Sequence, residues 1–545
     1  MTTGYEGPNT MPRKTDRPAR HGRSHPVSVR RVMGPGAMRR IALLPVAGLM
    51  AGCNDTRDLA PGSSDHAWRP VNRAGLSLPP DIRNPARSDI AGPIVPGSIR
   101  EGKILPEETR QPVGLAELID FAQRNNPETR IAWQRARQAA IGVGIARAAL
   151  LPQLTLSVMG GFQRMALPLP NYLSSRGYLT SNGAAVFPKL ELEYLLFDFG
   201  RTKAHIDEAQ FQTLAANFGF TAVHQQLILD VISAYRAYQA AQAIASAAQK
   251  AVENMALLLR AAEARRAHGE ATVTDVATAQ RNLAQARFDL DKAKDGEHAA
   301  RHALLEVAGL PATLSLRIAP MNAARLPRAG KDEIRQLVDR ALASRPDLMA
   351  DIARLRAQDA AVAGSRAALR PKISFAGTAQ GYLGALKSYG TGRSAPASAI
   401  AQPEAGVFMQ MSWPIYQGGL RSNAIHMAES RRDAARATLL KDRLQVERQV
   451  ADSQDALETA LVQVKSARVL NEAAIIANEG AAQAYRHGVG TITDASSAAA
   501  ALFEAQASLA VSISQAFTRA ASLAHATGQL DLGANTTQEG GENLP

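Results

Sequence analysis

Two eight-residue stretches of this chain repeat one another: HGEATVTD at 268–275 and HGVGTITD at 487–494. They lie 219 residues apart, and each contains a glycine, a threonine and an aspartate at matching positions. The same spacing relates four further pairs of residues, which are Pro127 and Pro346, Pro152 and Pro371, Gly200 and Gly419, and Gly309 and Gly528. Because only two long copies occur, the sequence predicts a duplicated unit rather than a solenoid of short repeats.

Long helices are predicted on both sides of each octapeptide. Helical sequence rich in alanine, the best helix former, runs from Gly200 to about His268 and resumes from Thr272 to about Val307. The second copy repeats this pattern 219 residues later. A helix of about 68 residues spans on the order of 100 Å, and such a length needs packing partners along all of it. Each copy is therefore expected to form a long helical hairpin.

Two strands are predicted ahead of each hairpin, after shorter helices that break at Pro127 and end before Pro152. LTLSVMGGF at 154–162 and KLELEYLLF at 189–197 alternate apolar and polar residues, which gives each strand one apolar face. The second copy keeps this phase with Ile373, Phe375, Met409, Met411 and Trp413. Sequence rich in Gly, Ser and Pro at 167–183 and 383–404 is expected to form the connecting loops.

Segments of about ten alternating residues are typical of transmembrane β-barrel strands, and Tyr194 and Trp413 would suit an interfacial aromatic belt. Four strands are too few to close a membrane barrel, since the smallest have about eight, so a barrel would require several chains. The alternative is an ordinary antiparallel sheet with one hydrated face. No run of 18 apolar residues occurs, so no transmembrane helix is expected.

The only cysteine, Cys53, follows two arginines, a short apolar run and two small residues, which is the layout of a secretory signal. The pattern resembles a bacterial lipoprotein signal, in which this cysteine is lipidated, and Asn54 after it then implies the outer membrane. A buried or free thiol, or an intermolecular disulfide, is the alternative. The true start is expected at Met38, or else at Met33, because a Pro- and Arg-rich stretch before a signal is unusual.

The formal charge of +13 falls to about +6 once the basic segment before Cys53 is set aside. No basic stripe with interleaved aromatic residues is present, so nucleic-acid binding is not expected. The sequence contains no metal-ligand cluster, phosphate-binding loop or nucleophile motif. Neither a cofactor nor an enzymatic activity is therefore expected.

The ordered, duplicated motifs resemble the TolC-like outer-membrane efflux protein family across about residues 112–530. They are NNP at 125–127, LP at 151–152, LFDFGR at 196–201, YQGG at 416–419 and the two octapeptides. The resemblance implies a mainly α fold with a transmembrane β-barrel part. In it, a duplicated helix–strand–strand–helical-hairpin unit assembles into a homotrimer, whose 12-stranded barrel continues as a long α-helical periplasmic tunnel.

The resemblance implies the outer-membrane channel of a tripartite efflux system, with a periplasmic adaptor and an inner-membrane pump of the resistance-nodulation-division type as partners. An exit duct of a type I secretion system is the alternative, and a lipoprotein adaptor is a further one, although an adaptor has one hairpin rather than two. The expected organisation is upstream extension and signal peptide at 1–52, lipid-anchored arm at 53–112, first repeat at 113–310, linker at 311–331, second repeat at 332–530 and tail at 531–545.

The resemblance places the functional residues mainly at the hairpin tips. Asp275, Asp494 and Tyr485 would belong to a periplasmic gate, where three copies of each aspartate form an acidic constriction. Glycine and threonine of the two octapeptides would contact the adaptor, namely Gly269, Thr272, Gly488 and Thr491, and Gly200 and Gly419 would turn each strand into its helix.

Local chemistry offers an alternative for the same positions: Thr272 or Thr274 caps a helix, and Asp275 favours its dipole. His268 and His487 are exposed loop residues or, alternatively, a pH-sensitive ring. An arginine found in some family members two residues after the turn glycine is replaced here by Gly490.

Overall fold

A computed structural model describes residues 59–68, 113–168, 170, 172, 177–314, 317–319, 326–327, 330, 333–389 and 398–530. The chain divides into two units, residues 1–53 and 54–545, and all described residues lie in the second. The predictions for Met38, Cys53 and the tail at 531–545 fall outside the described residues.

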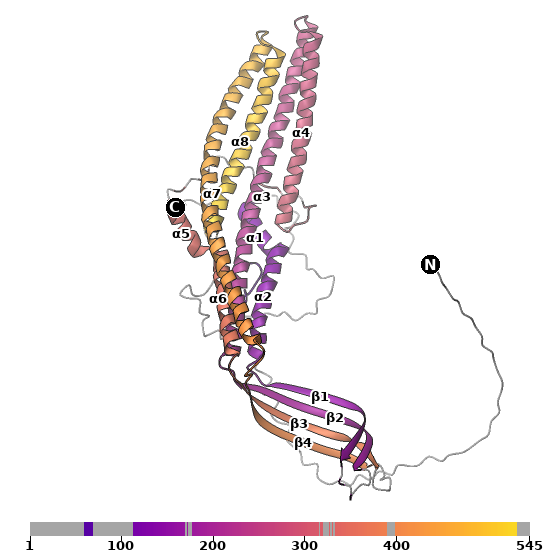
Figure 1. The fold of residues 1–545 in the computed structure, drawn as a ribbon. Coiled ribbons are helices and arrows are strands. Elements are labelled where there is room, and N and C mark those ends of the chain that lie inside the picture. The colour runs from indigo at the N-terminus through magenta and orange to yellow at the C-terminus, as the bar shows by residue number, and fades with distance from the viewer. Residues whose placement is uncertain are drawn as a thin grey trace, which may run out of the picture. The chain divides into compact units, whose positions relative to one another are not determined.

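The two repeats contain the same elements in the same order (Figure 1). The first repeat consists of α1 Leu115–Asn125, α2 Pro127–Ala148, β1 Gln153–Pro168, β2 Tyr178–Phe197, α3 Arg201–Ala267 and α4 Val273–Val307. The second consists of α5 Ile334–Ser344, α6 Pro346–Ala367, β3 Lys372–Tyr389, β4 Ser398–Ser412, α7 Leu420–Arg486 and α8 Ile492–Ala526. Every helix begins and ends 219 residues after its counterpart, so the structure confirms the duplication and the predicted long hairpins.

In both repeats, the junction between the two short helices contacts the C-terminal end of the helical hairpin, that is, of α4 in the first repeat and of α8 in the second. Asn126 caps α2 by accepting a hydrogen bond from the Glu128 N–H at 2.8 Å, and its amide donates to the Val307 carbonyl at 2.9 Å. In the second repeat buried Arg345 stands in this position and donates to the Ala526 carbonyl at 3.3 Å. Different side chains thus satisfy the same free carbonyl at a helix end.

The four strands form one antiparallel sheet in the order β1-β2-β3-β4. Apolar positions align across it, as in the row Leu156, Leu190, Ala379 and Ala405, and polar positions align on the other face, as in the row Ser157, Lys189, Gln380 and Glu404. Because side chains alternate along a strand, this register keeps one apolar and one polar face over all four strands. The predicted phase of the strands is confirmed.

The loop prediction was wrong at both hairpins, since the strands extend into the expected loops. β1 reaches Pro168 and β2 starts at Tyr178, while β3 reaches Tyr389 and β4 starts at Ser398. Residues such as Asn182, which pairs with Arg164, are poor strand formers by composition. Pairing of their backbone groups with neighbouring strands outweighs that preference.

Trp413 also lies outside its predicted strand. β4 ends at Ser412, and Pro414 cannot donate a ladder hydrogen bond. The Trp413 indole instead donates to the Leu369 carbonyl at 3.2 Å. Tyr194, its sequence counterpart, remains within β2 opposite Phe375, so the two aromatic residues are not structurally equivalent.

The helices pack side by side beyond the sheet. α2 packs on α3, α3 on α6 and α6 on α7, and the distal parts of α3 and α7 pack against α4 and α8. Figure 1 shows the sheet at one end of these helices and the two hairpin turns at the other. Among the described residues, no helix is both long and apolar enough to cross a lipid bilayer.

Part of the expected extended arm lies on this helical body. The indole of Trp133 in α2 donates to the Pro61 carbonyl at 2.9 Å, and the amide of Asn217 in α3 donates to the Leu59 carbonyl at 2.8 Å. Trp68 stacks edge-on against Phe218 of α3. Residues 59–68 are therefore held on α2 and α3 by specific side chains.

Candidate functional site

The turns at the hairpin tips have the same backbone in both repeats. Gly269 and Gly488 have φ values of +78° and +79°, in the left-handed region that favours glycine. The N–H after each glycine returns to the preceding helix, from Glu270 to the Arg265 carbonyl at 2.8 Å and from Val489 to the Ala484 carbonyl at 3.0 Å. This glycine-dependent helix ending reverses the chain tightly at each tip.

The threonine and the aspartate of each octapeptide form a capping box at the start of the returning helix. The Asp275 N–H donates to the Thr272 hydroxyl at 3.1 Å, and the Asp275 carboxylate accepts from the Thr272 N–H at 2.7 Å. Thr491 and Asp494 make the same reciprocal contacts at 3.1 and 3.3 Å. The capping interpretation is confirmed, with Thr272 rather than Thr274 as the cap.

The hydrogen bonds from the backbone N–H and the hydroxyl of Thr272 hold the pKa of Asp275 below its ordinary value. The carboxylate is therefore charged at neutral pH, and the residue is partly exposed to solvent. A charged group at this position suits both a helix cap and the acidic constriction, which stays a prediction.

Tyr485, the third predicted gate residue, is buried where all four hairpin helices meet. Its side chain is only 3% exposed and packs among apolar residues of α3, α4 and α8, which include Leu258, Ala262, Val276 and Ile492. Its hydroxyl has no hydrogen-bond partner among the described residues. Burial raises the pKa of Tyr485 above its ordinary value. Packing, rather than a hydroxyl contact, holds this residue.

Arg265 connects the two tips and was missed from the sequence. Its guanidinium donates to the Tyr485 carbonyl at 2.9 Å, lies 5.2 Å from the centre of the Tyr485 ring and is 3.7 Å from the Glu270 carboxylate. The residue 219 positions later is Ala484, so the contact exists in one direction only. The difference between Arg265 and Ala484, at otherwise matching tips, was the feature of the sequence that could have identified this residue. Arg266, the next residue along α3, is exposed.

Gly490, where some family members have arginine, leaves little room for the Cβ atom of a side chain. A Cβ atom at this position would lie 3.2 Å from the Tyr485 backbone nitrogen and 3.0 Å from the Ala484 side chain. The absence of arginine here therefore matches the tight turn, and Arg265 supplies the cation beside Tyr485 from the other hairpin.

The strand-to-helix turns use glycine in both repeats, as predicted. Gly200 and Gly419 have φ values of +90° and +82° and directly precede α3 and α7. The Asp198 carboxylate accepts from the Thr202 N–H at 2.7 Å and thereby caps α3. Among the described residues, no three His, Cys, Asp or Glu side chains converge to hold a metal ion.

Comparisons with known proteins assign both repeats to one family. The family model described as outer membrane efflux protein matches residues 118–310 and 337–529. The chain is similar to the outer membrane protein OprJ of Pseudomonas aeruginosa, at 27% identity over 69% of this chain and 75% of OprJ. It is also similar to the outer membrane efflux protein BepC of Brucella suis biovar 1, at 25% identity over 81% of this chain and 90% of BepC.

The fold is similar to that of the outer-membrane channel OprN, with a TM-score of 0.63 at 21% identity over 76% of this chain and 90% of that one. Since both halves match one family model and the fold is shared, the expected duplicated channel-tunnel fold is confirmed. The chain belongs to the outer membrane efflux protein family, whose members are passive outer-membrane channels rather than enzymes.

Proposed function

We propose that three copies of this chain form a channel-tunnel that conducts substrates from the periplasm to the exterior as part of a tripartite efflux system. The observation that carries the proposal is that the described unit has two open lateral sides that complement one another.

Within the described residues the sheet has two free edges, because β1 pairs only with β2 and β4 pairs only with β3. Edge strands of this length expose unpaired backbone groups and invite pairing with another chain. If β4 of one protomer pairs with β1 of the next, three copies supply about twelve strands and can close a membrane barrel. The apolar face would then meet lipid and the polar face would line the lumen.

The helices are open on the same two sides. α3 lies between α2 and α6, whereas α7, its counterpart in the second repeat, packs on α6 alone in this layer. Three helices at these open sides expose large apolar side chains, namely Leu440, Leu444, Val469, Leu470 and Ile476 of α7, Ile131, Ile141 and Ile145 of α2, and Val273 and Phe288 of α4. Exposed apolar surface of this extent indicates an interface. A ring in which α7 packs on α2 and α4 of the next copy would cover it.

The duplication supplies the register of this contact. Within one chain, a Cβ atom on Gly364 of α6 would lie 3.4 Å from the Cβ of Ala204 in α3. The residues 219 positions away are Ile145 of α2 and Asn423 of α7. If neighbouring protomers repeat the internal packing, Ile145 of one copy contacts Asn423 of the next.

The tips would form the periplasmic gate, with Asp275 and Asp494 facing the axis and Tyr485 and Arg265 holding the hairpins together. The adaptor would contact the exposed tip turns, and an inner-membrane pump would supply the cargo. A lipid chain on Cys53 would anchor the assembly to the outer membrane. The same channel could instead serve as the exit duct of a secretion system, and the identity of the pump would distinguish this function from efflux.

Cysteine cross-linking tests the assembly. We expect Ile145→Cys combined with Asn423→Cys to form disulfide-linked oligomers in outer membranes, since the expected Cβ separation suits a disulfide. Gly364→Cys with Ala204→Cys is the matched control, because it should cross-link within one chain and leave the oligomer band unchanged. Heat-sensitive trimer bands and channel activity in planar bilayers complete the test. A monomer without conductance would refute the proposal.

A further inference from the structure

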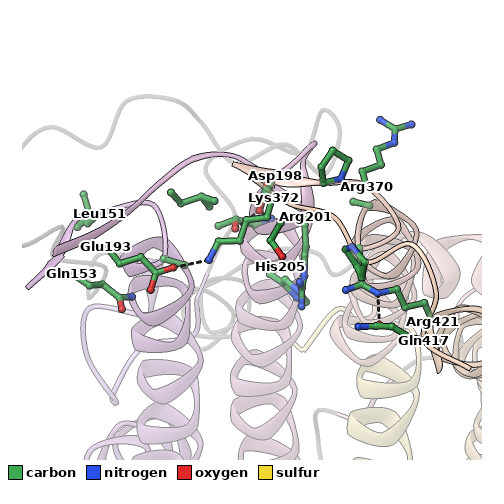
Figure 2. A pocket seen from close by; sticks show the side chains of 18 residues that line it. Leu151, Gln153, Glu193, Asp198, Arg201, His205, Arg370, Lys372, Gln417 and Arg421 are labelled. Atoms are coloured by element: carbon green, nitrogen blue, oxygen red, sulfur yellow. Dashed lines mark hydrogen bonds and ion pairs between the residues drawn. The ribbon is translucent and has the colours of Figure 1, made fainter. Parts of the chain in front are cut away.

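A cavity of about 510 Å³ lies where the sheet meets the helices (Figure 2). Its walls come from the first residues of β1 and β3, the last residues of β2 and β4, and the adjoining ends of α3 and α7. None of the residues assigned above to the gate lines it. The cavity is therefore separate from the hairpin tips.

The cavity carries more positive than negative charge. Arg201, Arg370, Lys372 and Arg421 line it, against two carboxylates, Glu193 and Asp198. Figure 2 shows Lys372 bound to Glu193, a contact of 2.8 Å. Asp198 is already engaged by the start of α3. The two acidic groups therefore have partners within the chain.

Among the described residues, the other three cations of the cavity, Arg201, Arg370 and Arg421, form no ion pair, and only Arg370 contacts an aromatic ring. Arg421 donates only to the side-chain oxygen of Gln417, at 2.8 Å, and in the described part of the chain neither Arg421 nor Arg201 forms an ion pair. Arg370 lies 5.8 Å from the ring of Phe199. A guanidinium presents several N–H donors in a planar fork that matches carboxylate and phosphate oxygens.

The register shows which side of the sheet the cavity faces. Gln153 pairs with Glu193, and Lys372 pairs with Ser412, and all four line the cavity. These positions belong to the polar face, since they alternate with Leu154, Leu192 and Ile373. In a barrel whose lumen is lined by this face, the cavity opens into the channel.

We propose that this cavity is a binding site for anionic groups, carboxylate or phosphate, on molecules that pass through the channel, with Arg201 and Arg421 as the residues that bind them. The placement in the lumen depends on the proposed function, whereas the anion site itself does not. Three such sites at one level of a trimer would form a cationic ring, and rings of arginine favour anions. The site would act in series with the acidic tips and select cargo that carries both cationic and anionic groups.

Inorganic pyrophosphate is a suitable probe, because its phosphate oxygens suit two guanidinium groups. We expect purified protein in detergent to bind pyrophosphate in a calorimetric titration, and Arg201→Gln with Arg421→Gln to weaken binding about tenfold or more. In planar bilayers the half-blocking concentration of pyrophosphate should rise by a similar factor. The reversal potential in a KCl gradient should shift toward cation preference.

Arg287→Gln with Arg436→Gln removes two exposed arginines outside the cavity and is the matched control. Absence of pyrophosphate binding by the unmodified protein, or equal weakening by the control pair, would overturn the anion site. Calorimetric binding without any channel in the bilayer would support the site and refute the proposed function instead. Binding together with an unblocked channel would overturn the lumenal placement.

Discussion

The guanidinium of Arg265 donates a hydrogen bond of 2.9 Å to the backbone carbonyl of Tyr485 and so joins the tip of one hairpin to the tip of the other. The bond links residues 220 positions apart in sequence. The arginine side chain is 20% exposed, which leaves the contact partly shielded from water. A charged hydrogen bond in such a site contributes about 1.5–3 kcal/mol.

Arg265→Gln is expected to loosen the contact between the tips and to open the channel more often. A loss of about 1.5–3 kcal/mol corresponds to a change of about tenfold or more in the open population, if the tips close the channel. Single-channel recording measures this population. Arg266→Gln is the matched control, since its side chain is exposed and adjacent in sequence. Equal effects of both variants would show that charge at the tip, rather than the Tyr485 contact, controls opening.

Tyr485→Phe is expected to preserve the packing of the helices at the tip. The hydroxyl is buried without a partner among the described residues, so its removal should leave stability unchanged or raise it by about 1 kcal/mol. Tyr485→Ala should cost about 3 kcal/mol, because it leaves a cavity where four helices meet. Conductance and thermal unfolding compare the two variants. If phenylalanine opened the channel as far as alanine, the hydroxyl would have to make a contact in the assembly.

The cap at Asp275 is expected to be insensitive to pH in the neutral range. Its folded pKa lies below the ordinary value of 3.8, so its stabilising contribution is complete above that value and is lost as pH falls through the lowered pKa. Hydrogen exchange of the first turn of α4 should show equal protection at about pH 7 and about pH 5, and less below about pH 4.

Asp275→Asn should reduce that protection at neutral pH and remove its acid dependence. Any change in conductance near pH 6 would then have to come from other groups. Replacing both His268 and His487 by glutamine tests the predicted histidine ring. A fall in protection of α4 at about pH 6 in the unmodified protein would contradict the assignment to Asp275.

Alanine at Gly309 is expected to cost more stability than alanine at Gly200. Both glycines have positive φ, +67° and +90°, so each substitution carries about 1 kcal/mol of backbone strain. A Cβ at Gly200 meets open space, whereas one at Gly309 would lie 2.9 Å from the Asn125 backbone. The total loss of stability on replacing Gly309 by alanine should therefore reach about 2–4 kcal/mol. Apparent melting temperatures of the purified protein compare the two variants, and equal losses would contradict the steric argument.

The features that could be predicted from the sequence are those that depend on residues close together along the chain. The tip turns require glycine in the left-handed region at Gly269 and Gly488, and Thr272 and Asp275 cap a helix through groups only three residues apart. Such features depend on neighbours along the chain, so the sequence by itself determined the helix ends, the duplication and the phase of the strands. It also carried the family motifs from which the channel was inferred.

The tertiary structure alone decided the features that depend on distant residues. The strands extend through Asn182 and into the expected loops because neighbouring strands pair with their backbone groups. Arg265 reaches Tyr485, and Arg201 and Arg421 line one cavity, because packing brings separate elements together. No local pattern encodes these contacts, since the free energy of each comes from atoms that approach only when the two repeats have folded against each other.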